Sequence, residues 1–370
     1  MKYLHLSIFD GHSKRHGGTR RSEQLRELLE DAGGLSGVTV NPYLGVKAAL
    51  RFSLRHPITF GSALLFSAKL YATRGLSFRG FLQYAVCSTN LMMVFDQHDF
   101  DLVLHETAPG ISIPFMQFMA AQGIDFIAIP HNIEYLVPGQ VMKAFRSNHR
   151  VYQTEIEGYR AARQVLSICD FDTAILRCNS VNAHTLEYRP TRLDRERCMR
   201  IRAARAAHES FEGFLLLGTV ENKPTFDGTK ALLEAMRVIQ PELKLTIAGY
   251  GTEKFKSYES DKVTVLGSVT DPEVDALLCQ TSALLINQPQ TTGFLTKVVE
   301  MNLSGVPQLI VSDYFQVAGL ERFGILKAKI ESLHDEKIAG PFQLFPEVNF
   351  DVLLRSIEST APTDTSKSPQ

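Results

Sequence analysis

Three residues near the carboxyl end of the chain have the types and the spacing expected of an anion-binding helix. Gly293, Lys297 and Glu300 occupy positions i, i+4 and i+7. They lie in GFLTKVVEMNLSGVP (293–307), which follows the apolar run ALLIN (283–287). If this run is a strand and a helix begins near Gly293, the free N–H groups and positive dipole of the helix face the end of the strand. A diphosphate fits such a site.

Each side chain of this segment has a chemical role in that interpretation. Gly293 lets phosphate oxygens approach the backbone, Thr292 adds a hydroxyl donor, and Lys297 adds a positive charge. Glu300 lies on the same helical face and would accept hydrogen bonds from the vicinal hydroxyls of a ribose, each worth roughly 1.5–3 kcal/mol. The alternative is a surface pair of Lys297 and Glu300, worth only about 0.2–0.5 kcal/mol.

Short apolar runs alternate with helical patterns along most of the chain, which is typical of βαβ units and parallel sheets. The sequence therefore predicts two tandem Rossmann-like, doubly wound α/β domains with an interdomain cleft. Ligands of such sheets bind beyond the carboxyl ends of the strands. The predicted strands are 3–9, 37–43, 101–106, 125–131, 164–169, 213–218, 244–249, 262–267, 282–287 and 307–312.

The domain boundary is predicted near residue 190. The segment 187–210 contains Pro190 and many arginines but few large apolar side chains, so we interpret it as a linker that includes a solvated helix. The expected organisation is a first domain over 1–189, a second over 190–345, a helix over 346–360 that packs back on the first domain, and a disordered tail over 361–370.

Composition narrows the class of protein. A net charge of −1 gives no indication of nucleic-acid binding. The five cysteines are odd in number and show no CxxC spacing, which indicates reduced thiols in a cytoplasmic protein. The start of the chain, MKYLHLSIFDGH, lacks the pattern of an export signal.

The most apolar region, 48–96, leaves two interpretations open. Its uncharged stretches are shorter than the ~20 residues of a spanning helix. Its basic residues, which lie among Leu, Phe and Tyr, are Arg51, Arg55, Lys69, Arg74 and Arg79. Such helices could make peripheral contact with the anionic inner face of a membrane, or they could pack on the sheet of the first domain with their arginines extended into water.

Glycines and histidines fall at the ends of predicted strands. Gly17 and Gly18 would permit a tight loop with backbone donors, followed by Thr19 as a helix N-cap, although a simple strand-to-helix turn explains them equally well. His105 and His131 lie at the carboxyl ends of their strands, where the cleft is expected. A single histidine in such a place is more often structural.

Four segments in order resemble the retaining GT-B glycosyltransferases, particularly family 4. TTGFLTKVVEMNLSGVPQLI (291–310) resembles the nucleotide-sugar signature of that family. KLTIAGYGTEKF (244–255), with VTVLGSVTDPEVDALLCQTSALLINQ (263–288) after it, resembles the strands that precede this signature. FLLLGTVENKPTFDGTKALLEAM (214–236) resembles the opening of the second domain, and IFDGHSKRHGGTRRSEQLRELLEDAG (8–33) the N-terminal strand, glycine loop and helix.

The resemblance implies a cytoplasmic, hexosyltransferase-like enzyme of polysaccharide biosynthesis. It would move a sugar with retention from a nucleotide-sugar donor to a glycan, lipid-linked or other hydroxyl acceptor, without a metal or other cofactor. His131 and Glu300 are the implied catalytic residues. The implied donor contacts are Gly17, Gly18, Lys223, Thr292, Gly293, Lys297 and Glu300, and the implied acceptor or sugar contacts are His105, Glu106, Asn132 and Glu134.

Departures from the family pattern keep other functions open. Relatives carry an Arg and a Lys in the region that matches 219–230, where this chain offers Lys223. One alternative is therefore a catalytically weak homologue that binds sugar nucleotides or assists assembly in polysaccharide biosynthesis, and another is an epimerase of the same fold.

Two Asp-x-Asp pairs also match a metal-binding pattern. Asp99 and Asp101 precede their strand and are interpreted as turn residues, and Asp170 with Asp172 as the start of a helix with an aspartate N-cap.

Overall fold

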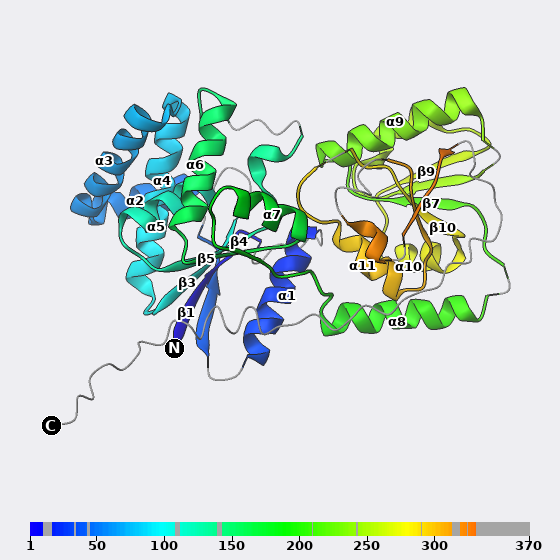
Figure 1. The fold of residues 1–370 in the computed structure, drawn as a ribbon, viewed down its shortest axis with the longest axis horizontal. Coiled ribbons are helices and arrows are strands. Elements are labelled where there is room, and N and C mark those ends of the chain that lie inside the picture. The colour runs from blue at the N-terminus through cyan, green and yellow to red at the C-terminus, as the bar shows by residue number, and fades with distance from the viewer. Residues whose placement is uncertain are drawn as a thin grey trace.

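The computed structural model describes residues 1–9, 17–32, 35–42, 45–107, 112–138, 143–208, 210–241, 243–289, 291–312, 319–323 and 325–330. These residues form two six-stranded parallel sheets, each flanked by helices (Figure 1). The predicted fold class, two Rossmann-like doubly wound domains, is confirmed. The predicted helix over 346–360 and the tail over 361–370 lie outside the described residues.

The first sheet has the strand order β2-β1-β3-β4-β5-β6. Its strands are β1 (Lys2–Leu6), β2 (Ser36–Val40), β3 (Leu102–Thr107), β4 (Phe126–Pro130), β5 (Gln164–Ser167) and β6 (Ala183–Thr185). Its helices are α1 (Gly17–Asp31), α2 (Gly45–Arg55), α3 (Pro57–Arg74), α4 (Phe78–Gln97), α5 (Ser112–Ala121), α6 (Asn148–Ala161) and α7 (Asp170–Cys178), with a short 3₁₀ turn, η1 (Glu134–Leu136). All residues of β3 and β4 are buried, because helices cover both faces of the sheet.

The second sheet has the order β12-β11-β10-β7-β8-β9. Its strands are β7 (Phe214–Leu217), β8 (Leu245–Ala248), β9 (Val263–Gly267), β10 (Ala283–Ile286), β11 (Gln308–Ile310) and β12 (Leu326–Lys327). The accompanying helices are α8 (Arg192–Ala206), α9 (Lys223–Ile239), α10 (Asp271–Gln280) and α11 (Thr296–Leu303), with the 3₁₀ turns η2 (Thr252–Tyr258) and η3 (Leu320–Phe323). Each predicted strand is present, nine of them in shortened form and β3 shifted by one residue, whereas β6 and β12 were not predicted, because they are too short to give a pattern.

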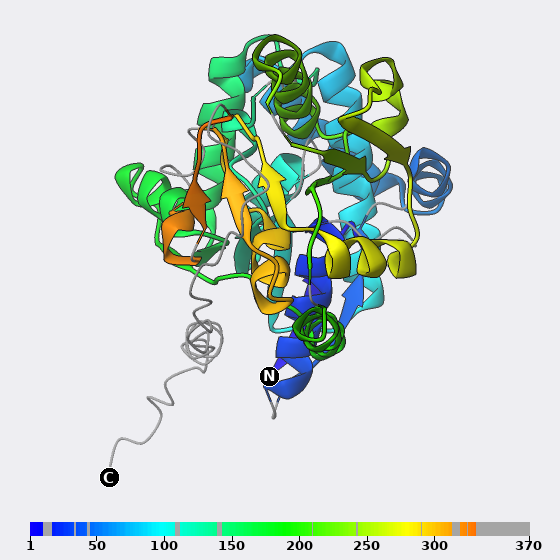
Figure 2. The same ribbon diagram turned by 90° about the vertical axis from the view of Figure 1, so that its right-hand side faces the viewer.

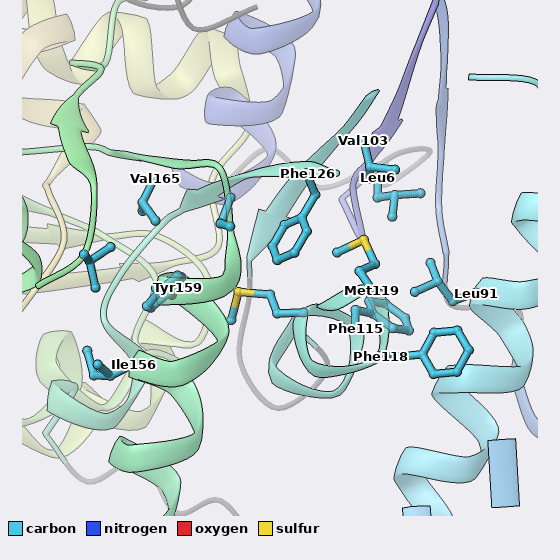
Figure 3. Close-up of a cluster of buried hydrophobic side chains, with 14 of the residues drawn as sticks. Leu6, Leu91, Val103, Phe115, Phe118, Met119, Phe126, Ile156, Tyr159 and Val165 are labelled. Carbon is cyan, nitrogen blue, oxygen red and sulfur yellow. The ribbon is translucent and has the colours of Figure 1, made fainter. Parts of the chain in front are cut away.

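Aromatic and aliphatic side chains fill the space between the first sheet and the helices α4, α5 and α6 (Figure 3). Phe115 and Met119 of α5 lie between Leu91 of α4 and the strands, and Tyr159 of α6 lies below Val165 of β5. All five side chains are fully buried. Burying this apolar surface fixes the sheet, and the sheet in turn fixes the loops that follow its strands. Among the described residues, no helix has the length and apolar character to cross a membrane.

The arginine-rich segment after the first domain is a packed helix, which corrects the prediction of a solvated one. Thr191 caps α8 by accepting a hydrogen bond from the amide N of Asp194 at 3.2 Å. Cys198 and Ile201 are buried where α8 contacts α10 and α11. On the other side α8 lies beside α1 (Figures 1 and 2).

Two acids of α1 neutralise part of this arginine run. The Glu27 carboxylate lies 3.8 Å from Arg192 and 3.9 Å from both Arg189 and Arg195. Asp31 accepts a hydrogen bond from Arg192 at 2.8 Å. The run therefore ties the two domains together.

The contact between α9 and the end of β10 predicts a matched pair of glycine substitutions. A Cβ at Gly228 would lie 1.9 Å from the carbonyl oxygen of Asn287, whereas a Cβ at Gly61 in α3 would meet nothing within 4 Å. Gly228→Ala should therefore destabilise the chain by about 1–3 kcal/mol, because backbone must move to admit the methyl group. Gly61→Ala should stabilise it by roughly 0.5–1 kcal/mol. Thermal and urea unfolding measure both changes, and equal effects would contradict the close packing of α9.

Candidate functional site

The loops that follow β4 and β10 are in direct contact across the two domains. The Thr292 hydroxyl donates a hydrogen bond to the carbonyl oxygen of Ile133 at 3.1 Å. The amide N of Gly293 donates to Oδ2 of Asp172 at 3.0 Å. A Cβ at Gly293 would lie 1.9 Å from Oδ1 of Asn132, so only glycine permits this approach. The two segments predicted to bind donor and sugar therefore meet at one point.

The helix predicted to begin near Gly293 begins instead at Thr296. Gly293 has a φ of +81°, which is incompatible with an α-helix. It therefore shares no helical face with Lys297 and Glu300. These two residues lie three positions apart on α11 but bind different partners, so the alternative of a surface pair is wrong as well.

Lys297 points toward the end of β7. Its Nζ donates a hydrogen bond to the carbonyl oxygen of Leu217 at 2.8 Å. Burial lowers the pKa of the Lys297 ammonium to about 8. A buried cation with one neutral acceptor gains from a nearby anion, because that anion offsets the loss of hydration.

Glu300 joins elements of both domains. It is only 5% exposed, and its Oε1 accepts a hydrogen bond from the Tyr188 hydroxyl at 2.8 Å. Its Oε2 forms an ion pair with Arg20 of α1. The carboxylate is therefore held by a helix of the first domain and by the segment that leads into α8.

The N-termini of α1 and α11 lie side by side at this boundary. A Cβ at Gly17, the first residue of α1, would be 3.4 Å from Oγ1 of Thr296, the first residue of α11. Neither helix has an acidic residue in its first turn. The dipoles of both helices therefore make this region electropositive. Gly18 follows Gly17 in α1, and Thr19, predicted to be the N-cap, is instead a buried residue inside the helix.

His131 follows β4 and contacts a buried carboxylate. Its Nε2 lies 2.8 Å from Oε2 of Glu106, and its ring lies 5.0 Å from that of Phe9. On the other side of the carboxylate, Nε2 of His5 lies 2.7 Å from Oε1. The Ser22 hydroxyl of α1 also donates to Oε2 of Glu106, at 2.5 Å. Glu106 thus links β1, α1 and the loop after β4.

The charge of Glu106 is stabilised despite complete burial. Burial alone would raise the pKa of this carboxyl group, but the imidazoles of His131 and His5 outweigh that effect and hold the pKa well below its usual range. Glu106 is therefore an anion that orients His131 through its Nε2.

The other predicted contacts of sugar or acceptor occupy different surroundings. His105 is fully buried within β3, with its ring 5.7 Å from that of Phe115. Glu134 is also buried, and Asn132 donates to it at 3.5 Å. Lys223 begins α9, is exposed, and pairs with Asp227 at 2.6 Å. The structure therefore brings together Asn132, Thr292 and Gly293, places Gly17 against Thr296, and puts His105 and Lys223 in separate environments.

A second pair of buried acids lies on α6 and α7. Oε1 of Glu155 accepts from the amide N of Glu134 at 2.8 Å, and Asp172 accepts from Gly293. Burial raises the pKa of each of the two acids to about 7. These acids were not predicted as site residues, and neither were His5, Arg20 and Tyr188, because their partners are distant in the sequence.

The two Asp-x-Asp pairs serve structural contacts. The Asp101 carboxylate accepts from the backbone N of Lys2 at 2.7 Å, and Asp99 pairs with the Lys2 side chain. Asp170 accepts from Thr185 at 2.7 Å, but the N-cap of α7 is Cys169, not an aspartate. Over the part of the chain that the structure describes, no group of three potential ligands is arranged to hold a metal ion.

Comparisons with known proteins show the fold. No protein-family model and no curated protein matches the chain. Sucrose-phosphate synthase from Thermosynechococcus elongatus is 12% identical, with a TM-score of 0.57 over 97% of this chain and 90% of that one. HepE from Anabaena, solved with UDP, is 11% identical, with a TM-score of 0.52 over 97% and 91%.

A third similar structure has a different activity. UDP-GlcNAc 2-epimerase from Methanocaldococcus jannaschii, solved with UDP-GlcNAc and UDP, is 9% identical, with a TM-score of 0.51 over 97% of this chain and 100% of that one. At such identities the similarity establishes the architecture alone. This chain has the GT-B fold.

The buried Asp172 predicts a pH-dependent stability. Its pKa is raised from 3.8 to about 7, so between these values the folded chain holds a proton that the unfolded chain has released. Unfolding releases this proton, and stability should therefore fall as the pH rises from about 4 to about 7. Asp172→Asn should flatten the decline and raise stability at pH 8 by on the order of 1–3 kcal/mol.

Thermal unfolding between pH 5 and pH 8 measures this slope. Asp170→Asn is the matched control, because Asp170 is an exposed carboxylate on the same turn of α7. It should keep the slope of the wild type. Glu155 will preserve part of the slope in Asp172→Asn, since the pKa of Glu155 is raised in the same direction. Identical slopes in all three proteins would contradict the burial of an ionisable Asp172.

The pairing of Glu106 predicts a large loss of stability on neutralisation. Glu106→Gln leaves two buried imidazoles without their anion and should cost roughly 3–5 kcal/mol. Glu157→Gln removes a partly exposed pair with Arg74 (2.8 Å) and should cost about 0–1 kcal/mol. Urea denaturation of the two variants distinguishes these values. Equal losses would show that Glu106 is not the anion on which this part of the first domain depends.

Proposed function

We propose that this chain is a glycosyltransferase that moves a sugar from a nucleotide-sugar donor to a hydroxyl acceptor. The observation that carries the proposal is the meeting of the N-termini of α1 and α11 beside Glu300. The GT-B fold supports it, since the similar HepE and epimerase structures were solved with UDP or UDP-GlcNAc. The finer assignment to retaining family 4 enzymes rests on the sequence motifs.

The donor diphosphate would bind at the two helix N-termini. Backbone N–H groups at the starts of α1 and α11 would donate to its oxygens, and Gly17 and Gly18 would allow close approach. Lys297 would supply a cation, and a diphosphate beside it would favour its charged form. These groups would stabilise the negative charge that develops on the nucleoside diphosphate as it leaves, with no metal ion required.

The donor ribose would bind to Glu300. A carboxylate has about four acceptor positions, and Arg20 and Tyr188 occupy one on each oxygen. One position on each oxygen remains for the vicinal hydroxyls of a ribose. The ion pair with Arg20 keeps the carboxylate charged and oriented, which strengthens each of these hydrogen bonds.

His131 would contact the transferred sugar. Glu106 accepts from its Nε2, so the imidazole is oriented before substrate binds. In the proposed reaction the bond between the anomeric carbon and the diphosphate oxygen breaks, and the acceptor oxygen bonds to that carbon on the same face. The acceptor proton passes to the departing diphosphate. His131 would position a sugar hydroxyl during this exchange and would not form a covalent bond.

A second candidate function is a sugar-nucleotide-binding partner with little turnover in polysaccharide biosynthesis. The ion pair of Lys223 with Asp227 on an exposed turn favours this second function, because it leaves Lys223 less able to bind a diphosphate. The remaining candidate cation, Lys297, already donates to a carbonyl oxygen. A protein of this kind would bind a donor without transferring its sugar.

Binding and turnover with UDP-, GDP- and ADP-sugars separate the two candidates. Thermal stabilisation measures binding, and donor hydrolysis or transfer to added acceptors measures turnover. One donor should stabilise the wild type, and Glu300→Ala should weaken its binding by at least about a hundredfold, since two charge-assisted hydrogen bonds, each worth roughly 1.5–3 kcal/mol, are lost. His131→Ala should bind this donor but lose turnover by at least about a hundredfold.

Glu221→Ala is a control at an exposed acid of the second domain that pairs with Lys254. It should behave as the wild type in both assays. Binding without turnover in the wild type would favour the second candidate, and interconversion of donor epimers would identify an epimerase. If none of the donors binds, the proposed function is wrong.

A further inference from the structure

The helices α2, α3 and α4 present a surface that the proposed function does not use. They pack on one another at the end of the first domain that lies away from the second domain (Figure 1). We call the exposed side of these helices the basic apolar face. Its large apolar residues are Leu50, Leu54, Ile58, Leu65, Tyr71, Phe78 and Leu82.

The apolar side chains on this face are exposed to water, two of them almost completely. Leu54 is 85% exposed and Ile58 is 87% exposed, on either side of the junction between α2 and α3. Ile58 and Leu65 are seven residues apart, so they lie on one side of α3. Seven of the sixteen exposed large hydrophobic side chains in the described part of the chain belong to this face. Such clustering indicates contact with an apolar medium.

Aromatic contacts continue the face from α3 to α4. The ring of Phe81 lies 6.1 Å from that of Tyr71 near the end of α3. It lies 6.2 Å from the ring of Phe78 at the start of α4. The exposed residues of the two helices are therefore neighbours in space.

The charged side chains of the helices α2, α3 and α4 are almost all basic. Residues 32–95 contain no aspartate or glutamate, although the whole chain has a net charge of −1. Among the described residues, Arg74 has an ion pair with Glu157 of α6. The cations Lys47, Arg51, Arg55, Lys69 and Arg79 have no ion pair within the described residues and extend from the same helices.

We propose that the basic apolar face binds the surface of an anionic lipid bilayer. The apolar side chains would enter the boundary of the acyl chains while the lysines and arginines reach lipid phosphates. A bilayer fits better than a protein partner, because the face carries basic residues without an acid of its own, and an anionic lipid surface offers negative charge to all of them at once. The proposal stands independently of the donor site, which is at the opposite end of the domain.

Sedimentation of the full chain with vesicles tests this binding. One vesicle type contains phosphatidylcholine alone, and the other contains about one-third phosphatidylglycerol. The wild type should bind the anionic vesicles at least about tenfold more tightly, and high salt should reduce the difference. The double variant Leu54→Glu/Ile58→Glu should lose at least about tenfold in affinity, because it places acids where apolar contact is made.

Val238→Glu is the matched control. Val238 of α9 is 84% exposed in the second domain, so this change adds an acid to an equally exposed aliphatic position outside the face. It should bind vesicles as the wild type does, and circular dichroism should show all proteins folded. Lack of preference for anionic vesicles, or equal binding by the double variant, would overturn the proposal. So would a dimer in light scattering that the double variant abolishes, since a second copy would then cover the face.

Discussion

The ion pair between Arg20 and Glu300 is the interaction on which the proposed site depends. Arg20 lies on α1 of the first domain and Glu300 on α11 of the second. Tyr188 adds a hydrogen bond from the connecting segment. Because one carboxylate is shared by three elements, the N-termini of both helices are held at the same point. The electropositive region exists only while the two domains are in this arrangement.

The two buried acids Glu106 and Asp172 have pKa values shifted in opposite directions. Glu106 lies between two imidazoles, so it remains charged when buried. Asp172 accepts a hydrogen bond from an amide N–H and forms no ion pair within the described residues, and burial therefore favours its neutral form. The first arrangement fixes His131, and the second joins the domains at Gly293.

The helix α8 contacts both domains, one through apolar packing and the other through ion pairs. Its apolar side packs on α10 and α11, so it belongs structurally to the second sheet. Arginines at its start pair with Glu27 and Asp31 of α1. The connection is therefore a packed element with partners on both sides, which restricts the relative movement of the domains more than a solvated linker would.

The sequence alone determined the parallel α/β class and all strands but β6 and β12, because apolar periodicity is a local signal. It also placed His131 directly after a strand and Glu300 on a helix. Only the tertiary structure decided their partners. Glu106, His5 and Arg20 are far from those residues in the sequence, and the long-range contacts that pair them leave no local pattern.

Just before the start of α11, Gly293 shows how a local sequence pattern and a tertiary contact can differ. The spacing of Gly293, Lys297 and Glu300 matches a helix, yet Gly293 adopts a positive φ, and Asn132 of the other domain occupies the space where a Cβ would lie. Local spacing cannot report a neighbour that is brought there by another domain. The composition of 48–96 likewise left two interpretations open, and the structure shows helices that both pack on one another and leave one side in water.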